Sequence, residues 1–261
     1  MIPTEFDYHR ATSLDDALAK IAGGNAKLLA GGHSLVPLMK LRLSEPGTLV
    51  DIARIPELSG IREKDGRIEI GSATVHHEVA TSALLQARCP IVAEAASTIG
   101  DPQVRNRGTL GGSLAHSDPS ADMPAVMVAL DADIHLRSGT GSRTVKASGF
   151  FQDLFTVDMQ PDEILTAVSF APVKASAYVK LYQKASHYAI VGVAAALDVS
   201  GGTIKSARIG LTGAITHAVR LTKVEQALAG QAASADTADK AAQGAGSGLE
   251  PINADIHASA D

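Results

Sequence analysis

Cysteine and aromatic residues are scarce in this 261-residue sequence, in which Cys89 is the single cysteine and tryptophan is absent. One thiol excludes a disulfide framework within the chain. It also excludes an iron–sulfur cluster held by this chain alone, because such a cluster requires several thiolate ligands. We expect Cys89 to be a small buried hydrophobic residue. Aromatic residues make up 3% of the chain, which gives little support to stacking on the bases of a nucleic acid.

Long hydrophobic runs and basic clusters are also missing. No apolar stretch approaches the roughly 20 residues of a membrane-spanning helix. The first segment, "MIPTEFDYHR", lacks a basic region followed by an apolar one. We therefore expect no transmembrane segment and a cytoplasmic protein. The formal net charge is −5 and Lys and Arg form no stripe, so no nucleic-acid partner is expected.

Length and composition indicate a globular protein of two or three subdomains. Hydrophobic residues make up 45% of the chain and charged residues 20%, as in proteins with a folded core. A composition shift near residue 172, from glycine-rich turns to a strand meander with closing helices, predicts domains at 1–172 and 173–261. The architecture is α+β, without strict alternation of strand and helix. Predicted elements include helices at 12–24 and 76–99, the latter interrupted at Pro90, and hairpins that turn at Asp65–Gly66 and Gly201–Gly202.

Two glycine-rich turns carry the strongest functional signal. The first, "AGGHSLVPLMK" (30–40), follows an apolar strand pattern and leads into a helical one, and "NRGTLGGSLAHSDPSAD" (106–122) repeats the arrangement. Glycine and small hydroxyl residues at such a turn expose successive backbone N–H groups, which bind an anion without a basic side chain. A tight turn without a ligand is the commoner reason for one Gly-Gly pair. Two such turns favour a single diphosphate held between them.

Other patterns argue against alternative sites. No G-x-G-x-x-G follows a strand, which disfavours a Rossmann nucleotide site. His33 and His116 lie in the glycine-rich turns, and neither these nor His76–His77 match a zinc spacing, so no metal site is assigned. A carboxylate beside a phosphate would repel it. One of Asp118 and Asp122 is therefore predicted to accept hydrogen bonds from ribose or ribityl hydroxyls.

The chain strongly resembles the FAD-binding medium subunit of molybdenum hydroxylases, the family that includes bacterial carbon monoxide dehydrogenase and xanthine dehydrogenase. Three segments carry the resemblance: "LLAGGHSLVPLMKLRL", "TIGDPQVRNRGTLGGSLAHSDPSADMPAVMVAL" and "DIHASAD". It runs over nearly the whole chain. It implies a vanillyl-alcohol-oxidase-like (PCMH-type) FAD-binding domain of two α/β subdomains, at about 1–55 and 56–172. A C-terminal three-stranded sheet with a helical bundle is implied in 173–261.

The resemblance also implies a set of FAD contacts at the positions that match the family's motifs. Ala30–Ser34 and Thr109–Ser113 would bind the diphosphate from opposite sides, and Asp122 would accept hydrogen bonds from FAD hydroxyls. The full predicted set is Leu28, Leu29, Ala30, Gly31, Gly32, His33, Ser34, Leu35, Ile99, Thr109, Leu110, Gly111, Gly112, Ser113, Asp122, Leu165, Lys184 and Tyr188.

The remaining implied contacts lie nearer the flavin ring. Ile99 would pack against the cofactor, and Leu165 and Lys184 would lie near it. Tyr188 matches an aromatic residue that packs near the isoalloxazine. His187 stands directly before it, where relatives are expected to carry an acidic residue, so different polar contacts and a different redox tuning are expected there.

By resemblance, the chain is an electron-transfer subunit of an oxidoreductase such as carbon monoxide, xanthine or aldehyde dehydrogenase. It would take electrons from two [2Fe–2S] clusters of a small subunit and pass them through FAD to an external acceptor. Substrate would be oxidised at a molybdopterin cofactor in a large subunit, within a dimer of heterotrimers, so no catalytic residue is assigned here. Two alternatives are a stand-alone FAD oxidase of the same fold and a non-enzymatic binding or assembly protein that kept the fold.

Overall fold

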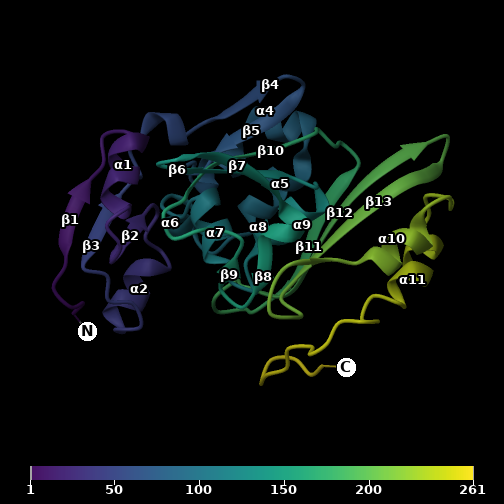
Figure 1. Cartoon of the computed structure of the whole chain (residues 1–261). Coiled ribbons are helices and arrows are strands. Elements are labelled where there is room, and N and C mark those ends of the chain that lie inside the picture. Colours follow the sequence, from purple (N-terminus) through teal and green to yellow (C-terminus); the bar gives the residue numbers. More distant parts are fainter. Residues whose placement is uncertain (1, 261) are drawn as a thin grey trace.

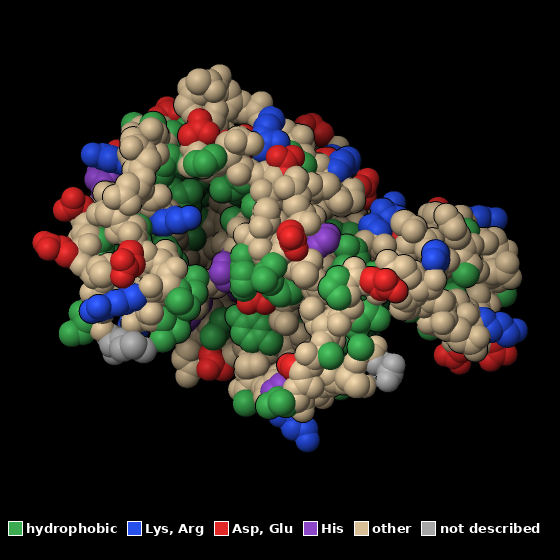
Figure 2. All heavy atoms as spheres, turned by 60° about the horizontal axis from the view of Figure 1, so that its bottom comes forward, with side chains coloured by type: hydrophobic (Ala, Val, Ile, Leu, Met, Phe, Trp, Pro, Cys, Tyr) green, Lys and Arg blue, Asp and Glu red, His purple; other side chains and the backbone are tan. Residues whose placement is uncertain are grey.

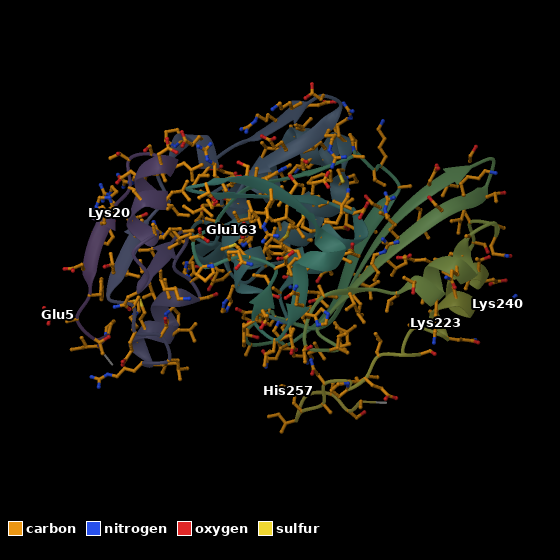
Figure 3. All side chains as sticks on the ribbon, viewed as in Figure 1. Glu5, Lys20, Glu163, Lys223, Lys240 and His257 are labelled. Atoms are coloured by element: carbon orange, nitrogen blue, oxygen red, sulfur yellow. The ribbon has the colours of Figure 1, made fainter. Side chains whose placement is uncertain are left out.

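A computed structural model describes residues 2–260, which form three parts in series along the chain (Figure 1). The N-terminal part and the C-terminal helices lie at opposite ends of the molecule, with the middle part between them. Figure 3 labels Lys20 in the first part, Glu163 in the middle part, and Lys223 and Lys240 at the far end. No helix among residues 2–260 is long and apolar enough to cross a membrane.

The first part is a parallel three-stranded sheet of order β1-β3-β2 with two helices. Its elements are β1 (Asp7–Arg10), α1 (Leu14–Ile21), β2 (Ala26–Leu29), α2 (Leu35–Lys40) and β3 (Thr48–Asp51). Helix α1 begins where the Ser13 side chain accepts a hydrogen bond from the N–H of Asp16. Its apolar face packs into a cluster with Val50 and Ile52. The first glycine-rich turn leaves the sheet at the end of β2.

The middle part is built on a five-stranded antiparallel sheet of order β4-β5-β10-β6-β7. Its strands are β4 (Ile61–Lys64), β5 (Arg67–Gly71), β6 (Asp133–Ser138), β7 (Gly141–Lys146) and β10 (Ile164–Phe170). Between β5 and β6 the chain forms α3 (His76–Thr81), α4 (Ala83–Arg88), α5 (Pro90–Ser97), α6 (Pro102–Arg105), α7 (Leu110–His116) and α8 (Asp122–Ala129). The short elements are η1 (Pro56–Leu58), α9 (Ala147–Phe150), β8 (Phe151–Asp153) and β9 (Thr156–Val157). Helices and sheet share one hydrophobic cluster.

The last part is an antiparallel sheet of order β11-β12-β13-β14 with two helices. Its elements are β11 (Ser176–Tyr182), β12 (Ala189–Ser200), β13 (Thr203–Thr212), β14 (Val219–Arg220), α10 (Thr222–Leu228) and α11 (Ala235–Ala242). The three long strands are the predicted three-stranded sheet, which the two-residue β14 extends at one edge. Helix α10 packs on β13, and α11 packs on α10.

Helix α8 joins the middle part to the last part. All eight of its residues are buried, because the helix contacts α5 and α7 in its own part and β12 and β13 in the last one. A helix that is apolar on every side is typical of such an enclosed position. Asp122, its first residue, is therefore held between the two parts.

The structure confirms the α+β class and most of the predicted elements. Both predicted hairpins form, β4–β5 around Asp65–Gly66 and β12–β13 around Gly201–Gly202. The predicted helix 76–99 is three helices, because Ser82 caps α4 by accepting from the N–H of Leu85 and Pro90 begins α5. The domain division at residue 172 falls between β10 and β11 and stays a prediction.

Candidate functional site

The two glycine-rich turns, far apart in the sequence, meet in space. A Cβ atom added at Gly31 would lie 2.2 Å from the carbonyl oxygen of Arg107 and 2.7 Å from the Cα of Gly108. Both of these atoms belong to the backbone, so neither can move aside as a flexible side chain would. Glycine at position 31 is therefore required by the close approach of the two turns. Figure 2 shows the surface hollowed between the N-terminal part and the middle part, with hydrophobic and histidine side chains on the walls.

The first turn carries a run of free backbone N–H groups. Within the described chain, residues 2–260, the N–H groups of Gly31–Leu35 have no hydrogen-bond acceptor. Gly32 has a φ angle of 76°, a left-handed value that glycine adopts without strain. Ser34 precedes α2, and its side chain makes no capping hydrogen bond to that helix. Successive N–H groups at such a turn form a nest that binds an anion.

The second turn was also expected to offer free N–H groups to a ligand. In the structure, these N–H groups are already bonded within the protein. The N–H of Leu110 donates to the Thr74 carbonyl at 3.0 Å, and that of Gly111 to the Ser72 carbonyl at 2.8 Å. The next two N–H groups donate to Thr109, which caps α7. These bonds fix the turn against the segment that follows β5. The second turn thus supplies a rigid wall and hydroxyl groups, while the first supplies free N–H groups.

Two buried polar atoms beside the second turn lack a partner in the part of the chain that the structure describes. They are the Ser72 hydroxyl and Nδ1 of His76. His76 packs against Gly108, and a Cβ at Gly111 would lie 2.4 Å from the Ser72 Cβ. Burial, with repulsion from His33, lowers the pKa of His76 to about 4, so its imidazole is neutral at pH 7. Orphaned polar atoms at the junction of two glycine-rich turns fit a site for a polar ligand.

Asp122 belongs to a buried cluster with Tyr178 and Lys180 on β11. The Tyr178 hydroxyl donates to the Asp122 carboxylate at 2.6 Å, and the Lys180 ammonium lies 3.0 Å from it. Burial raises the pKa of Asp122, and the nearby lysine and tyrosine oppose that rise. Burial and the same carboxylate raise the pKa of Tyr178. Both carboxylate oxygens of Asp122 thus have partners within the protein. The predicted contact of Asp122 with FAD hydroxyls stays a prediction.

Tyr188 lies beside the segment that connects the second turn to Asp122. It is 48% exposed, and burial, together with Asp118 and Asp122, raises the pKa of its hydroxyl. The residue after it, Ala189, donates its N–H to the Ser120 carbonyl at 3.2 Å. The structure therefore brings the predicted flavin-ring residue next to the segment between the second turn and Asp122.

Three other predicted residues, Ile99, Leu165 and Lys184, lie on different segments of the chain. Ile99 follows α5, is half-buried, and accepts a hydrogen bond at its carbonyl from Arg105. Leu165 is buried within β10 in the main hydrophobic cluster. The Lys184 side chain is exposed in the loop between β11 and β12 and has no hydrogen bond or ion pair among residues 2–260. Its role at the cofactor stays a prediction.

The sequence analysis did not predict a role at the cofactor site for four polar residues near it, Ser72, His76, Tyr178 and Lys180. Ser72 and His76 follow β5, in a segment that is not glycine-rich. Tyr178 and Lys180 alternate along β11 with the exposed Val179, so the polar residues face inward and the apolar one faces outward. That reversed alternation was the available signal, since residues i and i+2 of a strand share a face.

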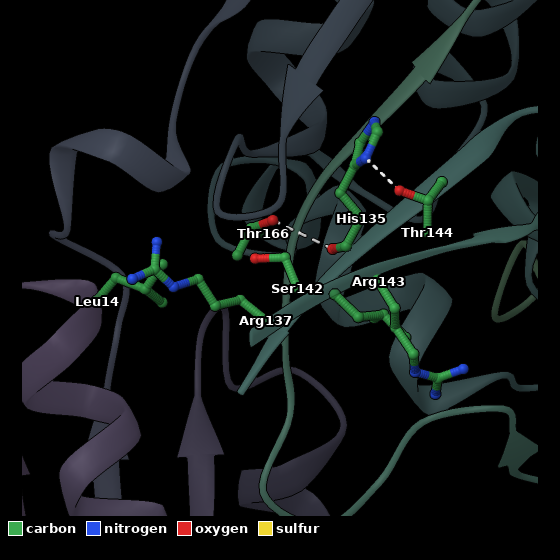
Figure 4. A pocket seen from close by; sticks show the side chains of 8 residues that line it. Leu14, His135, Arg137, Ser142, Arg143, Thr144 and Thr166 are labelled. Carbon is green, nitrogen blue, oxygen red and sulfur yellow. Dashed lines mark hydrogen bonds between the residues drawn. The ribbon is translucent and has the colours of Figure 1, made fainter. Parts of the chain in front are cut away.

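A depression of about 420 Å³ lies elsewhere, between the start of α1 and the sheet of the middle part (Figure 4). Its charged groups are paired: Arg137 contacts Asp15, and Arg143 contacts Asp158 and Glu163. In Figure 4 the Arg137 side chain extends toward α1, while Arg143 points the other way. With these charges already neutralised, the depression is a weaker candidate than the junction of the turns. Within residues 2–260, no group of three or more His, Cys, Asp or Glu side chains could hold a metal ion.

The fold brings the two glycine-rich turns together, and comparison with known proteins identifies the family of the chain. The family described as FAD binding domain in molybdopterin dehydrogenase matches residues 4–173. The CO dehydrogenase flavoprotein C-terminal domain matches residues 176–261. The chain therefore belongs to the FAD-binding medium subunits of multisubunit molybdenum hydroxylases, as the resemblance predicted.

Individual relatives agree over the full length. The carbon monoxide dehydrogenase medium chain of Hydrogenophaga pseudoflava is 42% identical over 100% of this chain and 92% of its own length. The glyceraldehyde dehydrogenase medium chain of Sulfolobus acidocaldarius is 36% identical over 96% and 90%, respectively. The solved carbon monoxide dehydrogenase of Hydrogenophaga pseudoflava superposes with a TM-score of 0.95, covering 100% of this chain and 92% of that one. At the level of the family, the predictions of FAD in this chain, and of molybdopterin and iron–sulfur centres in partner subunits, are confirmed.

Proposed function

We propose that this chain holds one FAD noncovalently, with the diphosphate between the two glycine-rich turns, and that it relays electrons from partner iron–sulfur clusters to an external acceptor. The observation that carries the proposal is the run of five N–H groups, Gly31–Leu35, that have no acceptor among residues 2–260. This run begins at Gly31, which lies against the backbone of Arg107 and Gly108. A diphosphate would accept hydrogen bonds from these groups without any basic side chain.

The chain's own residues provide binding and orientation rather than chemistry. When bound, FAD would supply the capacity to accept and release electrons. The first turn would hold the phosphates, and the second turn, fixed by its bonds to Ser72 and Thr74, would set their distance from the middle part. Tyr188 would cover the isoalloxazine, and Ile99 would pack against the cofactor. None of these residues acts on the substrate oxidised by the large subunit.

The domain and cellular assignments belong to the same proposal. Residues 1–172 would form the FAD-binding domain, divided near residue 55, and 173–261 the C-terminal domain. Most of each of the three hydrophobic clusters lies within one part, and the first two also include residues of a neighbouring part, such as Ala194 in the middle cluster and Ile164 in the N-terminal one. A cytoplasmic location and a dimer of heterotrimers are proposed by analogy with the family. The substrate depends on the large partner subunit.

The first test is the release of FAD from the purified full-length chain. Acid precipitation is expected to leave the yellow colour in the supernatant, because the proposed contacts are hydrogen bonds. Colour that stays in the pellet, with a flavin–peptide mass adduct, would contradict noncovalent binding and direct attention to His33 and His116. Absence of any bound flavin would instead favour a protein that kept only the fold.

The second test compares the lone chain with the complex formed by co-expression with its partner subunits. Substrate-driven reduction of the acceptor is expected only in the complex, because one cysteine cannot ligate two clusters. Full activity of the lone chain would overturn the subunit assignment in favour of a stand-alone FAD oxidase.

A further inference from the structure

The Lys180 ammonium joins three segments that surround the candidate flavin site. It donates to the Thr98 carbonyl at 3.0 Å, to the Asp122 carboxylate at 3.1 Å and to the His187 carbonyl at 2.7 Å. These acceptors belong to the end of α5, the start of α8 and the loop between β11 and β12. An ammonium group has three donors, so all of its hydrogen-bonding capacity is used. The Lys180 side chain is only 5% exposed.

Each acceptor is, or directly precedes, a residue expected to contact FAD. Thr98 precedes Ile99, Asp122 is itself in the predicted set, and His187 precedes Tyr188. We propose that Lys180 is a positioning residue of the flavin site, which holds the Tyr188 loop in place against α5 and α8. This inference rests on the proposed function, because it needs FAD beside Tyr188.

The backbone of the loop that carries Tyr188 includes one residue in a left-handed conformation. His187 has a φ angle of 61°. This left-handed conformation is strained for a residue with a Cβ atom, so the surrounding structure must hold it in place. Within the loop, the Gln183 side chain accepts from the N–H groups of Ala185 and Ser186. Those bonds shape the loop but do not attach it to the middle part. Lys180 lies on β11, and its bond to the His187 carbonyl joins the loop to an ammonium group that also bonds the end of α5 and the start of α8. A second link to the middle part is the bond from the Ala189 N–H to the Ser120 carbonyl.

Charge explains why the tether is a lysine paired with an aspartate. A buried ammonium is stable only if a counter-charge and hydrogen-bond acceptors replace water. Asp122 supplies the charge, and the two carbonyls satisfy the remaining donors. Tyr178 completes the cluster by donating to the same carboxylate at 2.6 Å. A lysine can therefore make three bonds here, where an apolar side chain of similar length such as methionine would make none.

The test uses the full-length chain loaded with FAD and measures the fluorescence of the bound flavin. A tyrosine packed on an isoalloxazine quenches its fluorescence by donating an electron to the excited ring. Lys180→Met is expected to raise the fluorescence per bound FAD several-fold, because the Tyr188 loop is released. It is also expected to weaken FAD binding roughly tenfold, because the packing of the Tyr188 ring on the flavin is lost.

A double-mutant cycle distinguishes positioning from a general structural effect. In a Tyr188→Ala background, which is itself expected to be bright, Lys180→Met should cause no further rise in fluorescence. An equal rise in both backgrounds, or weaker binding with unchanged fluorescence per bound FAD, would overturn the inference. If wild type binds no FAD, or Tyr188→Ala leaves the fluorescence unchanged, the proposed placement of the flavin itself fails.

Two further variants keep the test interpretable. Lys180→Met leaves the Asp122 charge buried without its partner, so the chain could fail to fold. Lys180→Met with Asp122→Asn removes both charges, and it is expected to show the same brightening, since the tether is still lost. Lys205→Met is the matched control: Lys205 is an exposed lysine of β13 in the same sheet, and its replacement should change neither fluorescence nor affinity.

Discussion

Replacing Gly31 by alanine tests whether the two glycine-rich turns form one cradle. The new Cβ would lie 2.2 Å from the Arg107 carbonyl oxygen, and ordinary contacts begin near 3.4 Å, so the turns must separate by about 1.2 Å. The φ angle at Gly31 is not left-handed, unlike that of Gly32. The substitution therefore acts through space alone and not through backbone strain.

The loss of affinity follows from that separation. A hydrogen bond stretched from about 2.9 Å by more than 1 Å is effectively broken. If the diphosphate stays with one turn, about two charge-assisted bonds to the other are lost, at about 1.5–3 kcal/mol each. The dissociation constant for FAD should then rise roughly 10²- to 10⁴-fold. The FAD-free chain should unfold at nearly the wild-type temperature, because the contact joins two surface turns.

The assay is titration of the FAD-free chain with FAD, followed by flavin fluorescence, beside thermal unfolding. Gly23→Ala is the matched control in the same part of the chain, because a Cβ there meets nothing within 4 Å. Wild-type affinity in Gly31→Ala, with the fold intact, would refute the idea that both turns bind one diphosphate.

Three further predictions concern the walls of the site. Gly111→Val should lower both the FAD affinity and the unfolding temperature, because its Cβ would lie 2.4 Å from the Ser72 Cβ and overpacking costs about 1–3 kcal/mol. In this it should differ from Gly31→Ala, and an unchanged unfolding temperature would contradict the prediction. Asp122→Ala should destabilise the chain by about 3–5 kcal/mol, because Lys180 is left buried without its partner, whereas wild-type denaturant stability would show that the pair contributes little. His76, with a folded pKa of about 4 against 6.5, favours the folded state above pH 6.5 and loses that contribution as the pH falls toward 4. Denaturant unfolding of the FAD-free chain should therefore show about 2 kcal/mol less stability from this group at pH 5 than at pH 7, and the loss should vanish in His76→Leu.

Local sequence signals predicted the turns but not how they meet. Gly31–Gly32 and Gly111–Gly112 could be found because glycine, hydroxyl residues and a following helix lie close together in the sequence. The contact of Gly31 with Arg107 could not, since it depends on how the first sheet packs on the middle part. The N–H groups of the second turn looked equally free in the sequence. They are bonded because residues after β5 run beside the turn.

The polar cluster was hidden for a different reason. Lysine in a strand is usually exposed, and nothing in the sequence around Lys180 shows the carbonyl groups that surround it in space. Lys184 was predicted instead through its place in a family motif, but the structure leaves that side chain in solvent. Asp122 was found because it follows the second turn. Its partner on β11 depends on the packing of α8 between two parts of the molecule.

Hydrogen–deuterium exchange with and without FAD tests the central claim most directly. The N–H groups of Gly31–Leu35 are free in the described chain, whereas those of Leu110–Ser113 are already bonded. We predict that FAD slows exchange strongly in a peptide covering 31–35 and changes it much less in one covering 110–113. Unchanged exchange at 31–35 in the FAD-loaded chain would contradict the assignment of this turn as the diphosphate cradle.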